Sequence, residues 1–597
     1  KSSGQRIVAY VIPESDNFSA SDPKLWAEQI AEWKTVFDET HSELSMHQGA
    51  TFNPLGWNSS YTGEPFPEAE IREQVEGTVE RILRKRPKKV LEIGCGTGLL
   101  LFAIAPHCDQ YFGTDFSEEI LAYTRRVASA SGYEPPHVEL LHRTADNFEG
   151  LLPESFDTVI LNSVVQYFPS VEYLLRVIQS ATKVVRPGGS IFIGDVRSLP
   201  LLRAFHASVQ FERAADATSR EQLQQLIAQQ MERESELIID PAFFYALPRQ
   251  ITDITSVEVS LKRGHYQNEL TRFRYDVTLY VGTEPPANCE AERLEWQQHS
   301  FTPHSLRDFL LCGEPEAVCV TGVPNARVLT DLHLVDLLAD QTGPADVKAI
   351  REAIGQSAVQ GIDPEAIWEL QTELPYAIEI GWTAENAGLD CFDVFIGRKA
   401  NDAGRETRSS ASAAKTDHLR PWTDYANTPL QEKLARGFVA AMRSALEAQL
   451  PDHMLPSAFV LLQKFPLTHN GKVDFTALAL ADQLRPETER PFVAPRTSVE
   501  TVVASVWAEV LRLDQIGVHD NFFELGGHSL LATQVLARLR VIFQANIPLR
   551  SFFEMPTVAG FSQAITTKQE NPGQIERIAE ILHRIVDMSD EAVREVL

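Results

Sequence analysis

The chain has 597 residues, of which 82 are acidic and 54 are basic, and its formal net charge at pH 7 is −28. Hydrophobic residues make up 44% and charged residues 23%, which is typical of several folded domains and excludes a disordered or collagen-like protein. The acidic balance argues against a nucleic-acid partner, because binding to a phosphate backbone depends on clustered Lys and Arg.

The apolar runs of the sequence are far shorter than the ~20 residues that cross a bilayer, and its first residues lead into no signal-peptide core. Six cysteines are scattered without the spacing of metal ligands, which is typical of thiols in a reducing compartment. We therefore expect a cytoplasmic protein with no membrane partner and no metal site.

Changes in composition divide the chain into segments. The opening run at residues 6–13 has the pattern of one buried strand, cut off from whatever precedes it. Residues 399–420 and 482–495 are rich in polar residues, small residues or proline and are predicted to be linkers. The charged tail at 568–597 contains an amphipathic stretch near 575–586, which predicts a docking or spacer helix.

Between residues 88 and 195, short apolar runs alternate with helical stretches. The predicted strands are residues 90–93, 111–115, 138–141, 158–162 and 190–195. This alternation predicts a parallel sheet with helices on both faces, in which ligands bind at the carboxyl ends of the strands.

The first of these strands ends in a glycine-rich turn. Glu92 is followed by Gly94, Cys95, Gly96 and Gly98, in the spacing G-x-G-x-G. Glycines let a turn tighten and let backbone N–H groups approach a ligand. The dinucleotide fingerprint is G-x-G-x-x-G, so we expect a nucleoside site without a bound phosphate. Nicotinamide binding is the alternative, and for the glycines alone so is a purely structural turn.

Polar residues after the next two strands extend the predicted nucleoside site. Asp115, followed by Phe116, ends the second strand, where a carboxylate can accept hydrogen bonds from both ribose hydroxyls. Ala145, Asp146 and Asn147 follow the third strand, where they can bind the edge of an adenine and cover its face.

The glycine turn and the acidic residues together resemble the class I S-adenosylmethionine-dependent methyltransferases. Four strings resemble one subfamily, the methyltransferase domains embedded in nonribosomal peptide synthetases: GWNSSYTG at 56–63, NSVVQYFP at 162–169, ELIIDPAFF at 236–244 and NELTRFRYD at 268–276. The resemblance runs from about residue 52 to residue 398. It implies methylation of the α-amino nitrogen of a carrier-bound aminoacyl group.

Methylation of an amine requires a proton acceptor, because an α-amine is largely protonated at neutral pH. The candidates for accepting the proton or holding the amine are Glu236, Asn268, Glu269 and Asp195. All four remain open, because Glu236 can equally form a salt bridge and Glu269 can lie in a hairpin turn between strands at 257–262 and 273–280.

Other residues are expected to surround the methyl group. Asn162, Gln166 and Tyr167 lie at the tip of the fourth strand, and Tyr61 can line the same pocket. Each tyrosine can equally be an ordinary half-buried aromatic residue. The helix-rich stretch 219–236 and the later region to about residue 393 are predicted to form an insertion or lid over the donor.

Two later strings, LPDHMLPSAFV at 450–460 and FPLTHNGKVD at 465–474, resemble the closing motifs of adenylate-forming enzymes. In that family the lysine that matches Lys472 contacts the acyl-adenylate; the alternative is a surface lysine in an Asn-Gly turn. Residues 6–13 resemble the preceding part of the same small subdomain. The methyltransferase is therefore expected to be inserted within this subdomain, and the large adenylation core is absent.

Residues 520–533, with the sequence DNFFELGGHSLLAT, resemble peptidyl carrier proteins. The resemblance implies that Ser529 carries 4′-phosphopantetheine, attached by a phosphopantetheinyl transferase. An N-cap serine is the alternative. The length of the segment and a periodic first helix at 502–511 predict a small helical bundle.

The sequence thus predicts a multidomain α/β protein: a class I (Rossmann-like) methyltransferase with lid insertions, set within a small α+β adenylation subdomain and followed by an all-α four-helix carrier bundle. The expected ranges are 1–20 and 421–481 for the adenylation subdomain, 21–398 for the methyltransferase and 496–567 for the carrier. Expected partners are an aminoacyl thioester, the missing adenylation core, and neighbouring condensation or thioesterase domains. C- or O-methylation and a catalytically silent scaffold are the alternative functions.

Overall fold

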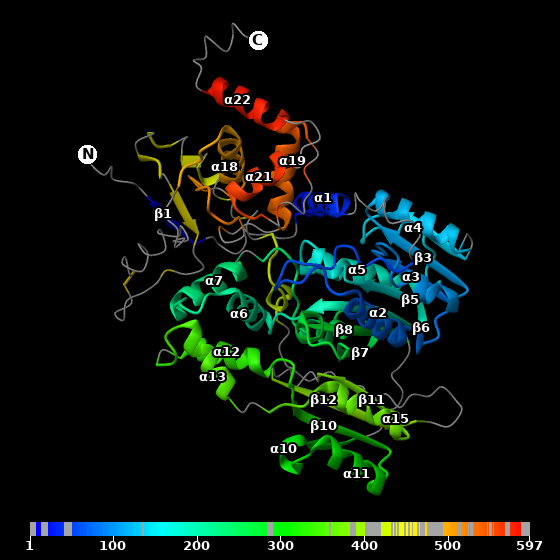
Figure 1. The fold of residues 1–597 in the computed structure, drawn as a ribbon. Coiled ribbons are helices and arrows are strands. Elements are labelled where there is room, and N and C mark those ends of the chain that lie inside the picture. Colours follow the sequence, from blue (N-terminus) through cyan, green and yellow to red (C-terminus); the bar gives the residue numbers. More distant parts are fainter. Residues whose placement is uncertain are drawn as a thin grey trace. The chain divides into compact units, whose positions relative to one another are not determined.

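The computed structural model describes residues 8–12, 22–40, 51–133, 137–232, 234–282, 291–340, 342–357, 360–382, 390–399 and, with gaps, 420–586. The chain divides into two compact units (Figure 1): His41–Pro429, and Lys1–Thr40 together with Leu430–Leu597. Most of the predicted linkers at 399–420 and 482–495 lies outside the described residues.

An 11-stranded sheet organises the unit His41–Pro429. Its strand order is β4-β3-β2-β5-β6-β8-β7-β11-β12-β10-β9. The first five strands of this order are parallel and lie where the sequence predicted them: β2 (Lys89–Ile93), β3 (Gln110–Asp115), β4 (Val138–His142), β5 (Phe156–Asn162) and β6 (Val185–Arg197). With the antiparallel pair β7 (Ile254–Leu261) and β8 (Arg274–Val281), they form the predicted Rossmann-like methyltransferase fold.

The central strands are continuous apolar runs because helices cover the sheet. Val159, Ile160 and Leu161 of β5 are fully buried. Helix α4 (Glu118–Ala130) packs on β3 and β4, and α5 (Val171–Val184) packs on β6. Each of these helices begins after a serine N-cap, Ser117 for α4 and Ser170 for α5, whose hydroxyl accepts a hydrogen bond from a first-turn N–H group.

Most of the later region, which was expected to form an insertion or lid, extends the sheet. Its strands are β9 (Glu292–Glu295), β10 (Ala317–Pro324), β11 (Tyr376–Gly381) and β12 (Cys391–Arg398). β11 joins β7 through the pair Gly381 and Ser260, where a Cβ on Gly381 would collide with the carbonyl oxygen of Val259. Glycine thus lets the two halves of the sheet meet.

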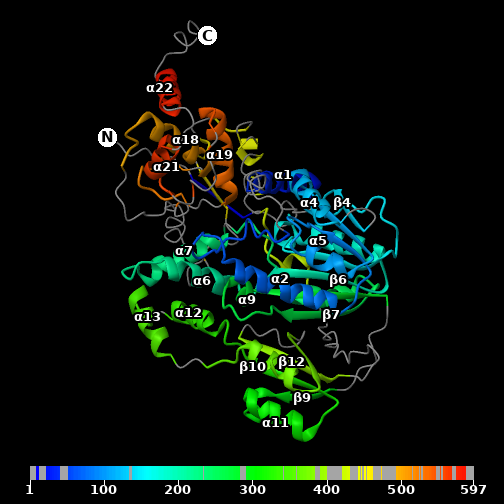
Figure 2. The same ribbon diagram turned by 45° about the vertical axis from the view of Figure 1, so that its right-hand side comes forward.

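Four helices form a separate layer in the same unit (Figure 2): α6 (Leu202–Arg213), α7 (Arg220–Glu232), α12 (Leu329–Ala339) and α13 (Val347–Gln356). Ala207, Leu223, Leu334 and Ile350 are buried in one apolar cluster, with one residue from each helix. α7 accounts for the predicted helix-rich stretch at 219–236.

The other unit contains two recognisable parts. β1 (Val8–Val11) and β13 (Ala458–Leu461) pair in parallel, although almost the whole methyltransferase unit lies between them in sequence. Helix α1 (Pro23–Thr40) also belongs to this unit. The second part is helical and consists of α18 (Ser498–Leu511), α19 (Ser529–Phe543), α21 (Val558–Thr567) and α22 (Gln574–Val586).

The helical part has one apolar core. Trp507, Phe522, Phe552 and Phe561 are fully buried, and their rings contact one another. The predicted amphipathic stretch of the tail is the helix α22, which buries Ile575 and Ala579 in the same core. The tail helix therefore contributes to the packing of the bundle.

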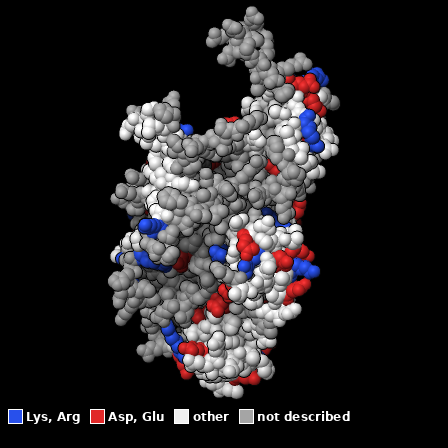
Figure 3. Space-filling model, turned by 90° about the vertical axis from the view of Figure 1, so that its left-hand side faces the viewer, with Lys and Arg blue, Asp and Glu red and all other residues white. Residues whose placement is uncertain are grey.

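Charged side chains of both signs lie side by side over the described part of the face shown in Figure 3. Within the described residues, no helix combines the length and the apolar character that crossing a bilayer requires.

We expect Gly381→Ala to destabilise the protein by about 1–3 kcal/mol, because an added Cβ overpacks the junction of β7 and β11. The matched control is Gly355→Ala in α13, where the added methyl meets open space. This change should stabilise the helix by about 0.5–1 kcal/mol. Thermal unfolding of the two variants measures the difference, and equal midpoints would contradict the role assigned to Gly381.

Candidate active site

The site lies where the order of the strands reverses. β3 and β4 follow β2 on one side, and β5 and β6 lie on its other side. In such sheets the ligand crevice forms at the carboxyl ends of the strands beside this switch point. The structure brings the ends of β2, β3 and β5 together there, and with them the glycine turn, Asp115 and Asn162.

The glycine turn after β2 needs its glycines for two physical reasons. Gly94, Gly96 and Gly98 all have positive φ angles, of 75°, 51° and 89°. A Cβ on Gly94 would collide with Val164, and one on Gly98 would lie 2.5 Å from Phe102 Cε2. Gly96 faces open space within 4 Å, so its backbone is the part of the turn that a ligand can approach.

Asp115 joins the end of β3 to this turn. Its carboxylate is buried and accepts hydrogen bonds from Gly96 N (3.0 Å) and Ser117 N (2.9 Å), one on each oxygen. A carboxylate oxygen can accept more than one hydrogen bond, so the group can also receive the two hydroxyls of a ribose. The donor set and the open face of Gly96 therefore fit a nucleoside.

Glu92 and Cys95 are both buried beneath the turn. Tyr111 Oη donates to Glu92 Oε2 at 2.8 Å, and burial raises the pKa of Glu92 to about 8. Burial also raises the pKa of the Cys95 thiol. The side chains of both residues therefore belong to the interior that supports the turn.

The residues that are expected to bind the adenine are held by hydrogen bonds to their neighbours. Asp146 Oδ1 accepts from Thr144 Oγ1 (2.8 Å) and Tyr173 Oη (2.9 Å). Asn147 is exposed and its Oδ1 accepts from Glu149 N at 3.0 Å. Phe116 and Ala145 are half-buried nearby in sequence.

The tips of β5 and β6 carry a strained pair of residues. Ser163 and Asp195 both have left-handed backbones, with φ angles of 55° and 64°. Ser163 Oγ donates to Asp195 Oδ2 at 2.9 Å, and Asn162 Nδ2 donates to Ser163 Oγ at 3.0 Å. Such strain in residues other than glycine is concentrated at functional sites.

Buried charges behind these tips hold Asp195. Asp276 Oδ1 accepts from Asp195 N at 2.9 Å, and the same carboxylate pairs with Arg81 (2.6 Å) and Lys262 (3.2 Å). The sequence did not predict the contacts of Asp276 with Arg81 and Lys262. The alternation of Arg274 and Asp276 with apolar residues along a strand that is buried on both faces could have indicated buried charges there.

Arg274 interacts with three of the four proton-acceptor candidates. Its Nη1 lies 2.6 Å from Asp195 Oδ2. Burial lowers the pKa of Arg274, but the charges of Asp195, Glu236 and Glu269 raise it above its usual value. Of these three carboxyl groups, that of Asp195 contacts the guanidinium, and those of Glu236 and Glu269 act on it through their charge.

Glu236 is the candidate with the most accessible carboxyl group. Its side chain is 27% exposed, and Arg197 bridges Glu236 Oε2 (2.8 Å) and Glu234 Oε2 (2.9 Å). Burial raises the pKa of Glu236; Arg197 opposes this change and Glu234 adds to it. A carboxyl group with a raised pKa accepts a proton more readily near neutral pH.

Tyr167 and Gln166 lie beside Glu236. Gln166 O accepts from Leu237 N at 2.7 Å. Burial and the charge of Glu236 raise the pKa of Tyr167, so its hydroxyl stays neutral. His206 Nε2 lies 3.3 Å from Glu234 Oε2.

Asn268 and Glu269 are engaged in holding other segments. Asn268 is the N-cap of α9 (Glu269–Phe273), and its Nδ2 donates to Glu70 Oε2 at 2.7 Å. Glu269 is buried, and its two oxygens accept from Ser60 N (2.9 Å) and Ser60 Oγ (2.7 Å). Glu269 thus lies on a short helix between β7 and β8.

Glu269 and Arg213 clamp the turn that carries Tyr61. Asn58 and Pro65 form an antiparallel bridge around this turn. Arg213 donates to Tyr61 O (3.1 Å) and to Ser60 O (2.5 Å), and Tyr61 Oη is hydrogen-bonded to Ser208 Oγ at 2.7 Å.

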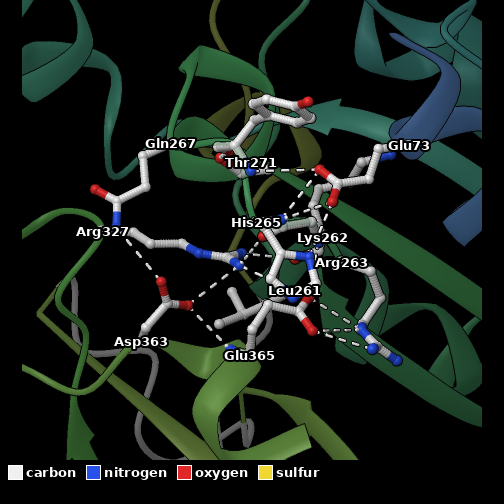
Figure 4. A network of polar contacts seen from close by, with 12 residues as sticks. Glu73, Leu261, Lys262, Arg263, His265, Gln267, Thr271, Arg327, Asp363 and Glu365 are labelled. Carbon is white, nitrogen blue, oxygen red and sulfur yellow. Dashed lines mark hydrogen bonds and ion pairs between the residues drawn. The ribbon is translucent and has the colours of Figure 1, made fainter. Parts of the chain in front are cut away.

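A polar network fixes the loop that leads into α9 (Figure 4). Arg327 donates to Lys262 O (2.7 Å) and Gly264 O (2.5 Å) and lies 3.4 Å from Asp363. Arg263 pairs with Glu365 at 3.0 Å. The loop, and with it Glu269 at the start of α9, is thereby held by helix α14 (Pro364–Trp368) and the residues before it.

His265 belongs to the outer part of the same network. It is exposed, and its Nδ1 lies 2.9 Å from Glu73 Oε1. Its backbone N–H group and its ring both contact Glu73, so His265 holds this loop against helix α2 (Glu68–Leu83).

Two predicted functional residues lie in the other unit. Lys472 is exposed, and the neighbouring residues 466–471 and 474–492 lie outside the described residues. Ser529 is the first residue of α19, and residues 526–528 before it lie outside the described residues. The roles of both residues stay predictions.

The strand order, the glycine turn and the acid at the end of β3 define a class I methyltransferase domain. Residues 91–191 match a family described as "Methyltransferase domain", and residues 501–565 match "Phosphopantetheine attachment site". These matches confirm the two predicted cofactors, S-adenosylmethionine and 4′-phosphopantetheine.

The chain is similar to nonribosomal peptide synthetases over nearly its whole length. Chondramide synthase cmdD from Chondromyces crocatus is 41% identical over 574 residues, which are 95% of this chain and 14% of that protein. Cyclosporin synthetase simA from Tolypocladium inflatum is 30% identical over 601 residues, covering 94% of this chain and 4% of that protein. The chain is thus similar to a methyltransferase-containing segment of these synthetases and spans only a small part of their length.

Solved structures show lower similarity. N-methyltransferase NodS from Bradyrhizobium japonicum WM9, in complex with S-adenosyl-l-homocysteine, is 17% identical. The match covers 41% of this chain and 100% of that chain, with a TM-score of 0.24.

We expect Asp115→Ala to weaken binding of S-adenosylhomocysteine by about tenfold or more, since a hydrogen bond to a charged group contributes about 1.5–3 kcal/mol. Isothermal titration of the full chain measures this change. The control is Asp109→Ala, because the Asp109 side chain is 73% exposed. Unchanged affinity in Asp115→Ala would exclude the assigned site.

We expect Glu92→Gln to remove a pH dependence of stability. The raised pKa means that the folded state favours neutral Glu92, so the wild-type protein loses stability as pH rises from about 4.5 to about 8. A glutamine oxygen still accepts from Tyr111 and carries no ionisation penalty. The thermal midpoint of the variant should therefore rise relative to wild type between pH 5 and pH 8.5; a constant difference would contradict the burial of an ionisable group.

Proposed function

We propose that this chain transfers a methyl group from S-adenosylmethionine to the α-amino nitrogen of an aminoacyl thioester, which is held on a pantetheine arm at Ser529. The observation that carries the proposal is the cluster of carboxyl groups at the tips of β5 and β6. Asp195, Glu236 and Glu269 lie around Arg274, and Glu234 lies beside Glu236.

The charge of this cluster favours an amine over other nucleophiles. Four carboxyl groups, those of Asp195, Glu234, Glu236 and Glu269, lie near the guanidinium groups of Arg197 and Arg274, and burial raises the pKa of Glu236. An ammonium group is attracted to such an environment, and a carboxylate there can take its proton. Methylation of carbon would require an anionic α-carbon, which the same carboxylates would disfavour.

The roles of the residues follow from their positions. The turn at Gly94–Gly98, Asp115 and Asp146 would hold the donor, which supplies an activated methyl group when bound. Glu236 accepts the proton of the substrate ammonium, and Tyr167 and Tyr61 border the path of the amine. Glu269 holds the turn that carries Tyr61.

The pairing of β1 with β13 supports the proposed domain order. Residues 8–11 and 458–461 come from the two segments that resemble one adenylation subdomain, and they form one small parallel sheet. We infer that the methyltransferase is inserted within that subdomain. In this arrangement Lys472 would act with an adenylation core on another part of the synthetase, and condensation or thioesterase domains would receive the product.

The experiment that tests the proposal is a transfer assay. The carrier is loaded with an aminoacyl pantetheine and incubated with methyl-labelled donor, and fragmentation mass spectrometry then locates the label. Label on the α-nitrogen supports the proposal. Label on carbon or oxygen favours the alternative methyltransferases, and absence of both transfer and donor binding favours a silent scaffold.

We expect Glu236→Gln to lower kcat by about 10²–10⁴-fold, the usual contribution of a positioned proton acceptor, without changing donor affinity. Wild-type activity should rise with pH through an apparent pKa above the ordinary value of glutamate. The matched substitution Glu269→Gln should cost much less, because a glutamine oxygen can still accept from Ser60. A larger loss in Glu269→Gln than in Glu236→Gln would exchange the two roles.

A further inference from the structure

Residues 420–429, here called the return segment, belong to the methyltransferase unit although the sequence assigned most of them to the following subdomain. Ala426 forms an antiparallel bridge with Ile239, and Ser198 forms a parallel bridge with Ile239 on the other side. Residues 236–240 therefore lie between the end of β6 and the return segment. This short stretch includes Glu236.

The backbone of residues 236–240 is hydrogen-bonded along both edges. Toward the sheet, Leu237 N donates to Gln166 O (2.7 Å) and Ile239 N donates to Arg197 O (3.0 Å). These bonds fix the stretch against the tips of β5 and β6. They leave the peptide groups of the even-numbered residues on the opposite edge.

Asn427 binds that opposite edge with its side chain and its backbone. Its Oδ1 accepts from Ile238 N (2.7 Å), and its Nδ2 donates to Glu236 O (2.8 Å). Asn427 N donates to Ile238 O at 3.3 Å, and Tyr425 O accepts from Asp240 N at 2.8 Å. Because Ile238 is fully buried, water cannot replace these partners.

Aromatic packing anchors the return segment. Tyr425 is buried, and the rings of Trp422 and Tyr425 lie 5.2 Å and 6.3 Å from the ring of Phe243. Arg420 lies 3.2 Å from Asp240 Oδ2 and over the ring of Tyr425. The asparagine is thus presented from a segment that is itself fixed.

We propose that Asn427 is a positioning residue for Glu236. By binding the peptide groups on both sides of Leu237, its amide fixes the backbone from which the Glu236 carboxyl reaches Arg197. The inference rests on the proposed role of Glu236 as proton acceptor. It also makes Asn427 a supporting residue of the methyl-transfer site.

Two variants in the full chain test the proposal with the loaded carrier as substrate. Asn427→Ala should lower kcat about tenfold or more, while the KM of the loaded carrier and donor affinity stay within about twofold. Asn427→Asp keeps an acceptor for Ile238 N but has no donor for Glu236 O. It should keep the bond to Ile238 N and still lower kcat, because the Glu236 peptide group is no longer held.

Hydrogen exchange provides a readout that is independent of activity. The amide of Ile238 should lose protection in Asn427→Ala and keep it in Asn427→Asp, whereas the amides of Leu237 and Ile239 should stay protected in both. The matched control is Trp422→Phe, which keeps an aromatic ring against Phe243 and removes only the Trp422–Gln250 hydrogen bond. Its kcat and the protection of Ile238 should be those of wild type.

The outcomes distinguish the positioning role of Asn427 from the proposed role of Glu236. Wild-type kcat in Asn427→Ala and Asn427→Asp, combined with loss of activity in Glu236→Gln, would overturn the positioning role and leave the proposed function intact. Wild-type kcat in Glu236→Gln would overturn the proposed role of Glu236 and the positioning role with it.

Discussion

The methyltransferase site depends on keeping several buried charges paired. Asp276 binds Arg81, Lys262 and the backbone N–H of Asp195, and Asp195 in turn binds Arg274. Removing one partner of a buried pair typically costs about 3–5 kcal/mol, because the remaining charge is left without compensation. The left-handed backbone of Asp195 persists only because these contacts determine it. Asp195, one of the candidate proton acceptors, is therefore held by a network of buried charges.

The same network explains how one end of the site can suit a cation. The expected donor end is built from backbone groups, Asp115 and Asp146, with Gly96 N bound to Asp115. The acceptor end collects carboxyl groups around Arg197 and Arg274, and Lys262 lies 4.0 Å from Asp195 Oδ1. An amine is the nucleophile that we propose for this site, because carboxylates attract its protonated form and one of them can accept its proton.

The sequence predicted the five parallel strands within a few residues because buried strands are continuous apolar runs separated by helices. It also predicted the glycine turn, because the positive φ angles at Gly94, Gly96 and Gly98 favour glycine, and closely spaced glycines are visible in the sequence. The later region was expected to form an insertion or lid, and the sequence did not predict that its strands β9 to β12 extend the sheet, because β11 joins β7 through one residue pair far away in sequence. Long-range pairing of this kind leaves no local pattern, and Arg81 and Lys262 were missed for the same reason.

The return segment shows why a domain boundary drawn from composition can cut through a functional site. The segment at residues 420–429 is short and lacks the periodicity of a helix or strand. Its composition therefore predicted the end of a linker followed by the next subdomain. Their role comes from pairing with residues 236–240, almost two hundred positions earlier. The cost of closing a loop grows only with the logarithm of its length, so such a late segment can complete an early strand at little extra entropic cost. A boundary placed at residue 398 would leave four backbone groups of residues 236–240 without the partners that Tyr425 and Asn427 supply.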